Sequence, residues 1–265
     1  TAYEIMPSLV GSEMCIRDSM RLMSSPEPYT VKTDWFEMND AVLQLRPYQD
    51  PIVPVAVASV ESPAGVTLAG KHGASVLSLS VPRDTIRKTS LAELWEIAEE
   101  TAAEHGKTMH REDWGVVMGM HLADSKEQAI KDIKEGAGNV VTEYFGHTLG
   151  NPVPDVPRDQ IVDFMVEKNQ WIVGTPDDCI AGIERLQDLT GGFGKFMKRV
   201  EDWAPRDKIH RSYELLARYV MPYFQGSLQG IQTSNEWASE RREALQANRY
   251  VGIKAATDRF DAGRT

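Results

Sequence analysis

Four short runs of strand-forming residues alternate with helical segments along the chain, and this alternation restricts the fold more than any other feature. The runs cover residues 55–58, 75–80, 114–123 and 195–200. The first run is wholly apolar and flanked by prolines, as expected for a strand buried on both faces. Strands that alternate with helices pair in parallel through right-handed crossovers, so the sequence predicts an α/β protein. Half of a (β/α)8 barrel and an open doubly wound sheet both fit this pattern.

The predicted helices have start and stop signals of their own. Ser62 as N-cap and Pro63 at the first helical position begin the helix after the first run, and Gly73 ends it. Later helices are expected to be capped by Asp124 and by Thr175, the latter followed by a proline. A capping box and a buried apolar stripe define one further helix: Ser90 and Glu93 with Leu91, Leu94, Trp95, Ala98 and Ala102.

Three segments outside this alternation have patterns of their own. Residues 29–47 predict a β-hairpin that turns at Asn39 and Asp40. Residues 146–157 are rich in proline and predict a long surface loop of the kind that borders pockets. A helix over residues 206–219 is expected to stop at Met221 and Pro222, and residues 227–265 predict a polar helical tail.

Charge and cysteine content limit the partners that this chain is expected to have. The formal net charge is −10, with no basic patch that interleaves aromatics, which argues against binding to nucleic acid or to an anionic membrane surface. Cys15 and Cys179 are too few for a disulfide framework and fit a reducing, cytoplasmic compartment. No apolar run reaches the roughly 18 residues of a membrane span, and no His, Cys, Asp and Glu cluster has metal-ligand spacing.

The turn over residues 59–65 is the candidate binding site. A strand that runs into a Ser-Pro helix start brings several free backbone N–H groups and the positive end of a helix to one point, where a phosphate is stabilised. The alternative is an ordinary capped helix start without a ligand. His121, near the end of the third run, is expected to be a hydrogen-bonded strand-end histidine, with a position facing a pocket as the alternative.

Several segments resemble the luciferase-like flavin-dependent monooxygenases, and within them the limonene monooxygenase-type members. The turn reads ASVESPAGVTLAGKHG, and the later segments read GTPDDCIAGIERL and TGGFGKFMKRVEDWAPRDKIHRSYELLARYVMPYFQG. Together with DWFEMNDAVLQLRPYQDP, they extend the resemblance over most of residues 29–226.

The resemblance implies a partial TIM (β/α)8 barrel of the bacterial-luciferase-like type, comprising strands five to eight and a C-terminal helical extension. It implies an enzyme that takes reduced FMN from a separate flavin reductase, uses O2 to oxygenate a small organic substrate, and forms a homodimer. The residues that it assigns to the cofactor are Ser59, Glu61, Ser62, Gly65 and Ser78, with Ser80 beside them.

The chain also departs from the family pattern. The first four strands are absent, and in the family they carry most contacts to the flavin ring and the active-site histidine. No catalytic residue is therefore assigned, and this chain alone is expected to be inactive. A reduced deazaflavin that transfers hydride, or a non-catalytic flavin-binding remnant, are the alternatives.

The N-terminal residues are treated apart from this fold. Residues 3–19 resemble a translated sequencing-adapter fragment, so residues 1–19 are expected not to be native and residues 20–226 to form the barrel portion.

Overall fold

The structure is a computed structural model that describes residues 16–34, 36–50, 52–60, 62–79, 89–199 and 201–263. The chain divides into two compact units, Thr1–Pro205 and Arg206–Thr265, which are described separately. Glu61, Ser80 and the first fifteen residues lie outside the described ranges.

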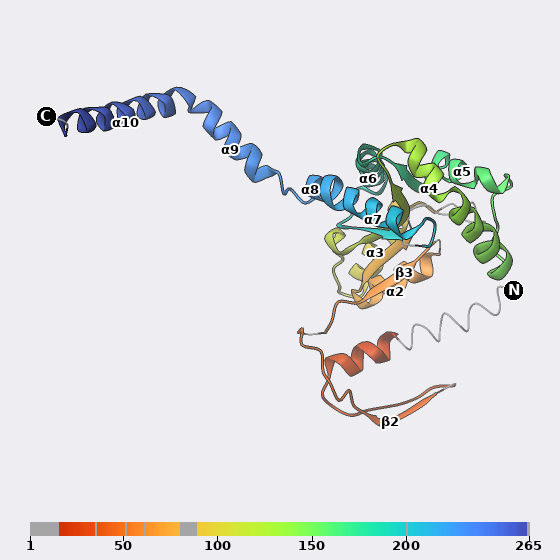
Figure 1. Ribbon diagram of the computed structural model, residues 1–265. Coiled ribbons are helices and arrows are strands. Elements are labelled where there is room, and N and C mark those ends of the chain that lie inside the picture. The colour runs from red at the N-terminus through yellow and green to blue at the C-terminus, as the bar shows by residue number, and fades with distance from the viewer. Residues whose placement is uncertain are drawn as a thin grey trace. The chain divides into compact units, whose positions relative to one another are not determined.

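A parallel sheet forms the centre of the first unit (Figure 1). Its strands are β3 (Ala56–Ser59), β4 (Ser75–Leu79), β5 (Gly115–Leu122), β6 (Trp171–Gly174) and β7 (Lys195–Arg199). The order is β3-β4-β5-β6, and β7 also pairs with β5, over Gly115–Gly119. Every pairing within this sheet is parallel, which confirms the predicted α/β class.

Strand β6 was not predicted from the sequence, because its four residues are too few to show a period. The other four strands lie where the sequence predicts them. β3 is not buried on both faces as expected: Val57 and Ser59 are buried, while Ala56 and Ala58 are exposed. Within the described sheet β3 is an edge strand that pairs only with β4.

Helices connect the strands of this sheet. They are α2 (Pro63–His72), α3 (Leu91–Glu104), α4 (Lys126–Asn139), α5 (Ile161–Glu167) and α6 (Pro176–Thr190), with short 3-10 turns at Arg111–Asp113 and Arg158–Gln160. The caps Ser62, Ser90 and Thr175 are confirmed, as is Gly73, which has φ 64°. The predicted cap Asp124 is wrong by one residue, because the hydroxyl of Ser125 accepts the hydrogen bond from Gln128 N.

Close packing between helices and strands fixes the helical layer. The predicted apolar stripe of α3 is buried, and Trp95 within it stacks on Trp114 with ring centroids 4.7 Å apart. Helix α2 approaches α3 so closely that a Cβ added at Gly70 would lie 2.5 Å from the carbonyl oxygen of Ala98. The close contacts of Gly70 with α3 and of Trp95 with Trp114 therefore fix the packing of these helices on each other and on the sheet.

The N-terminal hairpin is present, but its turn is not where the sequence predicted it. Strands β1 (Tyr29–Lys32) and β2 (Glu37–Ala41) pair antiparallel, and Thr33 N donates to Phe36 O across the turn. Asp40 instead lies within β2 with φ 49°, beside a register irregularity, and its carboxylate accepts from the Thr30 hydroxyl. Asp40 therefore lies at a bulge and not at the turn, and its backbone N–H donates to the Thr30 hydroxyl across the strand pair.

The predicted loop over residues 146–157 is shorter in the structure. A π-helical segment, η2 (Val140–Thr148), continues α4, so irregular backbone starts only after it.

The second unit is entirely helical in the residues that the structure describes. It comprises α7 (Arg206–Leu215), the π-helical segment η4 (Leu216–Val220), α8 (Met221–Phe224), α9 (Gln229–Glu240) and α10 (Arg242–Ala262) (Figure 1). The predicted stop at Met221 and Pro222 is wrong, because Pro222 lies in the first turn of α8, where its missing N–H is tolerated. No helix within the described ranges combines the length and apolar character of a membrane span.

Candidate functional site

The turn between β3 and α2 brings together three of the residues that the sequence assigned to a cofactor. Ser59 ends β3 with its side chain buried, and its hydroxyl donates to the carbonyl oxygen of Ser62 at 3.4 Å. The Ser62 hydroxyl in turn accepts from Ala64 N at 3.1 Å. Two side-chain hydrogen bonds thus hold the turn that the Ser-Pro helix start predicted.

Gly65 allows the start of α2 to lie against the end of the strand. A Cβ added there would be 3.1 Å from the Ser59 Cβ and 3.1 Å from the Ala58 carbonyl oxygen. This is tighter than ordinary van der Waals contact, so the position favours glycine. Ser59, Ser62 and Gly65 therefore form one compact turn, which we call the β3–α2 turn.

The electrostatics of the β3–α2 turn suit an anion. α2 has no acidic residue in its first turn, and Lys71 and His72 lie in its last turn. The N-terminal end of the helix dipole therefore has no neighbouring carboxylate among the residues of that first turn, and Ser62 is exposed. A phosphate group could use backbone N–H groups and the Ser62 hydroxyl here.

Ser78 does not join the β3–α2 turn through its side chain. It is buried on β4, and its hydroxyl accepts a hydrogen bond of 3.1 Å from the indole N–H of Trp114. Trp114 belongs to the aromatic cluster with Trp95 and Phe193. The Ser78 hydroxyl is therefore engaged in packing between β4 and the segment before β5. Glu61 and Ser80, also assigned from the sequence, lie outside the described residues.

A second group of polar residues lies at the carboxyl end of β5, and the sequence analysis named only one of them. His121 is buried, with its Nε2 atom 3.5 Å from Asp132 Oδ2 on α4. The expectation of a hydrogen-bonded histidine fails at this atom, which has no hydrogen-bond partner in the described part of the chain. The only sequence signal for Asp132 is its position on the predicted helix, about one turn after the buried Ala129.

Two further groups, the partly buried Lys198 and the buried Cys179, have shifted pKa values. Burial lowers the pKa of Lys198 on β7 to about 8 and raises the pKa of the Cys179 thiol on α6 to about 12. The Cys179 Sγ atom lies 3.2 Å from Met120 Sδ, a packing contact. Neither residue was singled out from the sequence as a site residue. Among the described residues no group of three or more His, Cys, Asp or Glu could hold a metal ion.

A family model described as luciferase-like monooxygenase matches residues 16–191. The 4-hydroxyprotoasukamycin monooxygenase of Streptomyces nodosus subsp. asukaensis is 43% identical over 231 residues, which are 86% of this chain and 62% of that protein. The limonene 1,2-monooxygenase of Rhodococcus erythropolis is 35% identical over 249 residues, 93% of this chain and 63% of that protein. The chain thus spans about three fifths of the length of these curated relatives.

A solved structure shares the fold. The oxygenating constituent of 3,6-diketocamphane monooxygenase from Pseudomonas putida, a type II Baeyer-Villiger monooxygenase in complex with FMN, superposes with a TM-score of 0.60. It is 22% identical in sequence, and the match covers 78% of this chain and 62% of that one.

Proposed function

This chain belongs to the luciferase-like monooxygenase family, and we propose that it is part of a flavin-dependent monooxygenase that uses reduced FMN and O2 to oxygenate a small organic substrate. The relatives named as monooxygenases support the reaction class. The β3–α2 turn is the observation in this chain that supports FMN in particular. We also propose that the parallel sheet is part of a (β/α)8 barrel.

The β3–α2 turn fits the phosphate end of FMN. Its helix start provides positive potential, Gly65 lets that helix start lie close against the end of β3, and Ser62 offers an exposed hydroxyl. Ser59 would hold the turn through its hydrogen bond to the Ser62 carbonyl. Glu61 stays in the proposed site from the sequence alone, and Ser78 would support it by anchoring β4 through Trp114.

Reduced FMN, when bound, would supply the electrons for the reduction of O2. The residues described here would bind its phosphate and keep the adjoining sheet rigid. A separate flavin reductase as the source of reduced FMN, and a homodimer as the assembly, are parts of the proposal that follow from the family resemblance.

The proposal is tested by titrating the chain with FMN and following the quenching of flavin fluorescence. Ser62→Ala removes the exposed hydroxyl and the cap of α2, and should raise the dissociation constant about tenfold, equivalent to about 1.4 kcal/mol. Thr175→Ala is the matched control, because Thr175 also caps a helix and also precedes a proline, but follows β6 instead of β3. The control should bind FMN like the original chain.

Three other results would each contradict a different part of the proposal. Equal FMN affinity in the original chain and Ser62→Ala would place the phosphate elsewhere. A preference for a reduced deazaflavin over reduced FMN would change the reaction to hydride transfer. A folded chain with no affinity for either flavin would be a non-catalytic member of the family. Limonene, the substrate in the name of one relative, is a suitable first probe for oxygenation.

A further inference from the structure

The imidazole of His121 lies in a water-poor position at the carboxyl end of β5. Its side chain is 4% exposed. Gly119, two residues earlier and so on the same face of the strand, lies against two indole rings: an added Cβ would be 2.6 Å from Trp203 and 2.8 Å from Trp171. Carboxyl ends of parallel strands are where sites form in such sheets. The polar ring of His121 is therefore buried on the strand face that packs against Trp171 and Trp203 of the core.

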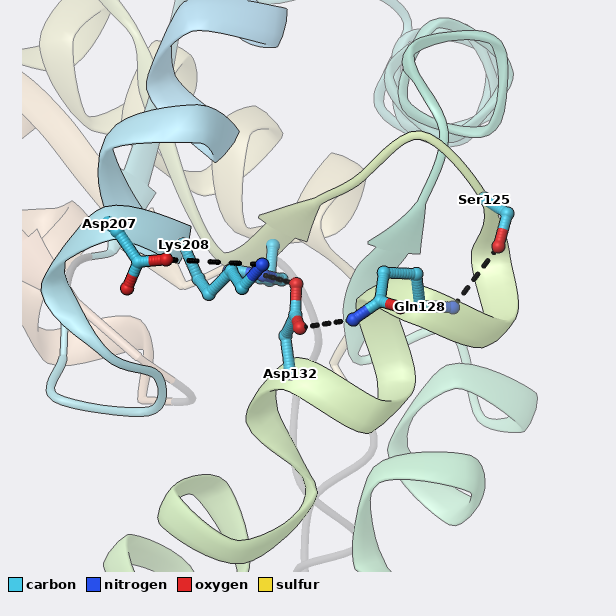
Figure 2. Close-up of polar contacts among 6 residues, drawn as sticks. Ser125, Gln128, Asp132, Asp207 and Lys208 are labelled. Carbon is cyan, nitrogen blue, oxygen red and sulfur yellow. Dashed lines mark hydrogen bonds and ion pairs between the residues drawn. The ribbon is translucent and has the colours of Figure 1, made fainter.

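One carboxylate oxygen of Asp132 faces the His121 ring, and the other accepts a hydrogen bond from a neighbouring side chain of α4. The side-chain amide of Gln128 donates to Asp132 Oδ1 at 2.5 Å, and Ser125, the cap of α4, accepts from the Gln128 backbone N–H at 3.2 Å (Figure 2). The other carboxylate oxygen, Oδ2, is the one 3.5 Å from His121 Nε2. The first turns of α4 thus orient a carboxylate toward the histidine.

Burial favours the neutral form of the His121 ring. Burial is the largest influence and lowers the pKa of His121 below its ordinary value, and Lys198 from β7 lowers it further. Asp132 from α4 opposes both by raising this pKa. A neutral imidazole whose Nε2–H faces a carboxylate has its lone pair on Nδ1, the arrangement of a general base.

We propose that His121 is an acid–base residue of this site, with Asp132 as the residue that positions its imidazole. The assignment rests on the proposed monooxygenase function. A proton leaves a group of the bound substrate and binds to Nδ1 of His121. The resulting imidazolium is balanced by the carboxylate of Asp132, which stays ionised, and the proton later returns to the product or to water.

The proposal is tested by ¹⁵N NMR of the histidine side chains in the full chain, with the His121 signals assigned by their loss in His121→Gln. We expect the Nε2–H tautomer at pH 7 and a pKa below 6.5, the ordinary value for histidine. Asp132→Asn should lower this pKa further and reduce the preference for that tautomer. Asp159→Asn, which removes an exposed carboxylate of the same unit, is the control and should change neither.

A second measurement asks whether the pair belongs to the flavin site. If it does, saturating FMN should raise the pKa of His121, because the phosphate is an anion, and by linkage the affinity for FMN should depend on the protonation of His121. His105, an exposed histidine on the end of α3, is the internal control for direct effects of the ligand. His121→Gln should remove that pH-dependent part of the affinity.

The outcomes separate this inference from the proposed function. A His121 pKa that is the same in Asp132→Asn would overturn the pairing. FMN binding that Ser62→Ala weakens, but that leaves the His121 pKa unchanged, would overturn the acid–base role while supporting the flavin site. Absence of FMN binding would refute the proposed function and the acid–base role together, while the tautomer measurement would still decide whether the two side chains are coupled.

Discussion

At the scale of single residues, hydrogen bonds within a few positions of the chain explain most of the β3–α2 turn. Ser59, Ser62 and Gly65 contact one another because a strand end, a cap and a close helix start follow in sequence. Sequence analysis could predict their proximity for that reason. It could not predict that Ser78 would be engaged by Trp114, which is 36 positions further along the chain.

Cys179 should be chemically inert in the folded protein. Burial raises the pKa of its thiol from an ordinary value of 9.0 to about 12, so the thiolate fraction at pH 8 is about a thousandfold lower than for an ordinary thiol. Iodoacetamide labelling followed by mass spectrometry should detect modification of Cys179 only after urea is added. Rapid labelling in the native protein would show that α6 opens from the sheet.

At the scale of elements, glycines mark where backbones meet most closely. Gly136 in the middle of α4 lies against the carbonyl group of Trp203, so an added Cβ would overlap a backbone atom. Sequence patterns indicate the helix but not this contact, since the partner follows 67 positions later and depends on how α4 packs.

Gly136→Ala should therefore lower the stability of the first unit by about 1–3 kcal/mol, although alanine favours helices more than glycine does. The measurement is urea denaturation followed by tryptophan fluorescence.

Gly252→Ala is the matched control, because no atom lies within 4 Å of a Cβ added at that helical glycine. This substitution should leave the free energy of unfolding of the first unit unchanged and should stabilise helix α10 by up to about 1 kcal/mol. Equal urea midpoints for the original chain and both variants would contradict the prediction, because α4 and Trp203 could then move apart without loss of stability.

At the scale of the whole molecule, the two units differ in how much of their surface is buried. In α9 and α10 every residue that the structure describes is exposed except Ala255, including Trp237, Tyr250 and Phe260. Long helices without tertiary contacts are of marginal stability in water, because packing supplies most helical stability in proteins.

Limited trypsin digestion should therefore cleave first after arginines of this segment, such as Arg241, Arg242 and Arg249, and only later within α2 to α6. Mass spectrometry of the early fragments gives the order of cleavage. Protection of these arginines in the full chain would indicate that another surface covers the exposed apolar residues.

Features that depend on neighbouring residues could be predicted from the amino-acid sequence. The alternation of strands and helices, the caps Ser62, Ser90 and Thr175 and the glycine end at Gly73 are all confirmed, since each requires contacts within about four positions. The family, too, follows from the order of residues.

Features that depend on pairing between distant segments became visible only in the folded chain. Strand β6 forms because residues Trp171–Gly174 pair in parallel with the last four residues of β5. The position of the hairpin turn is set by the register in which β1 and β2 pair. Asp132 faces His121 because α4 folds back onto the sheet. Such contacts need the whole chain to be collapsed, because the free energy that fixes them comes from packing and burial and not from local backbone preference.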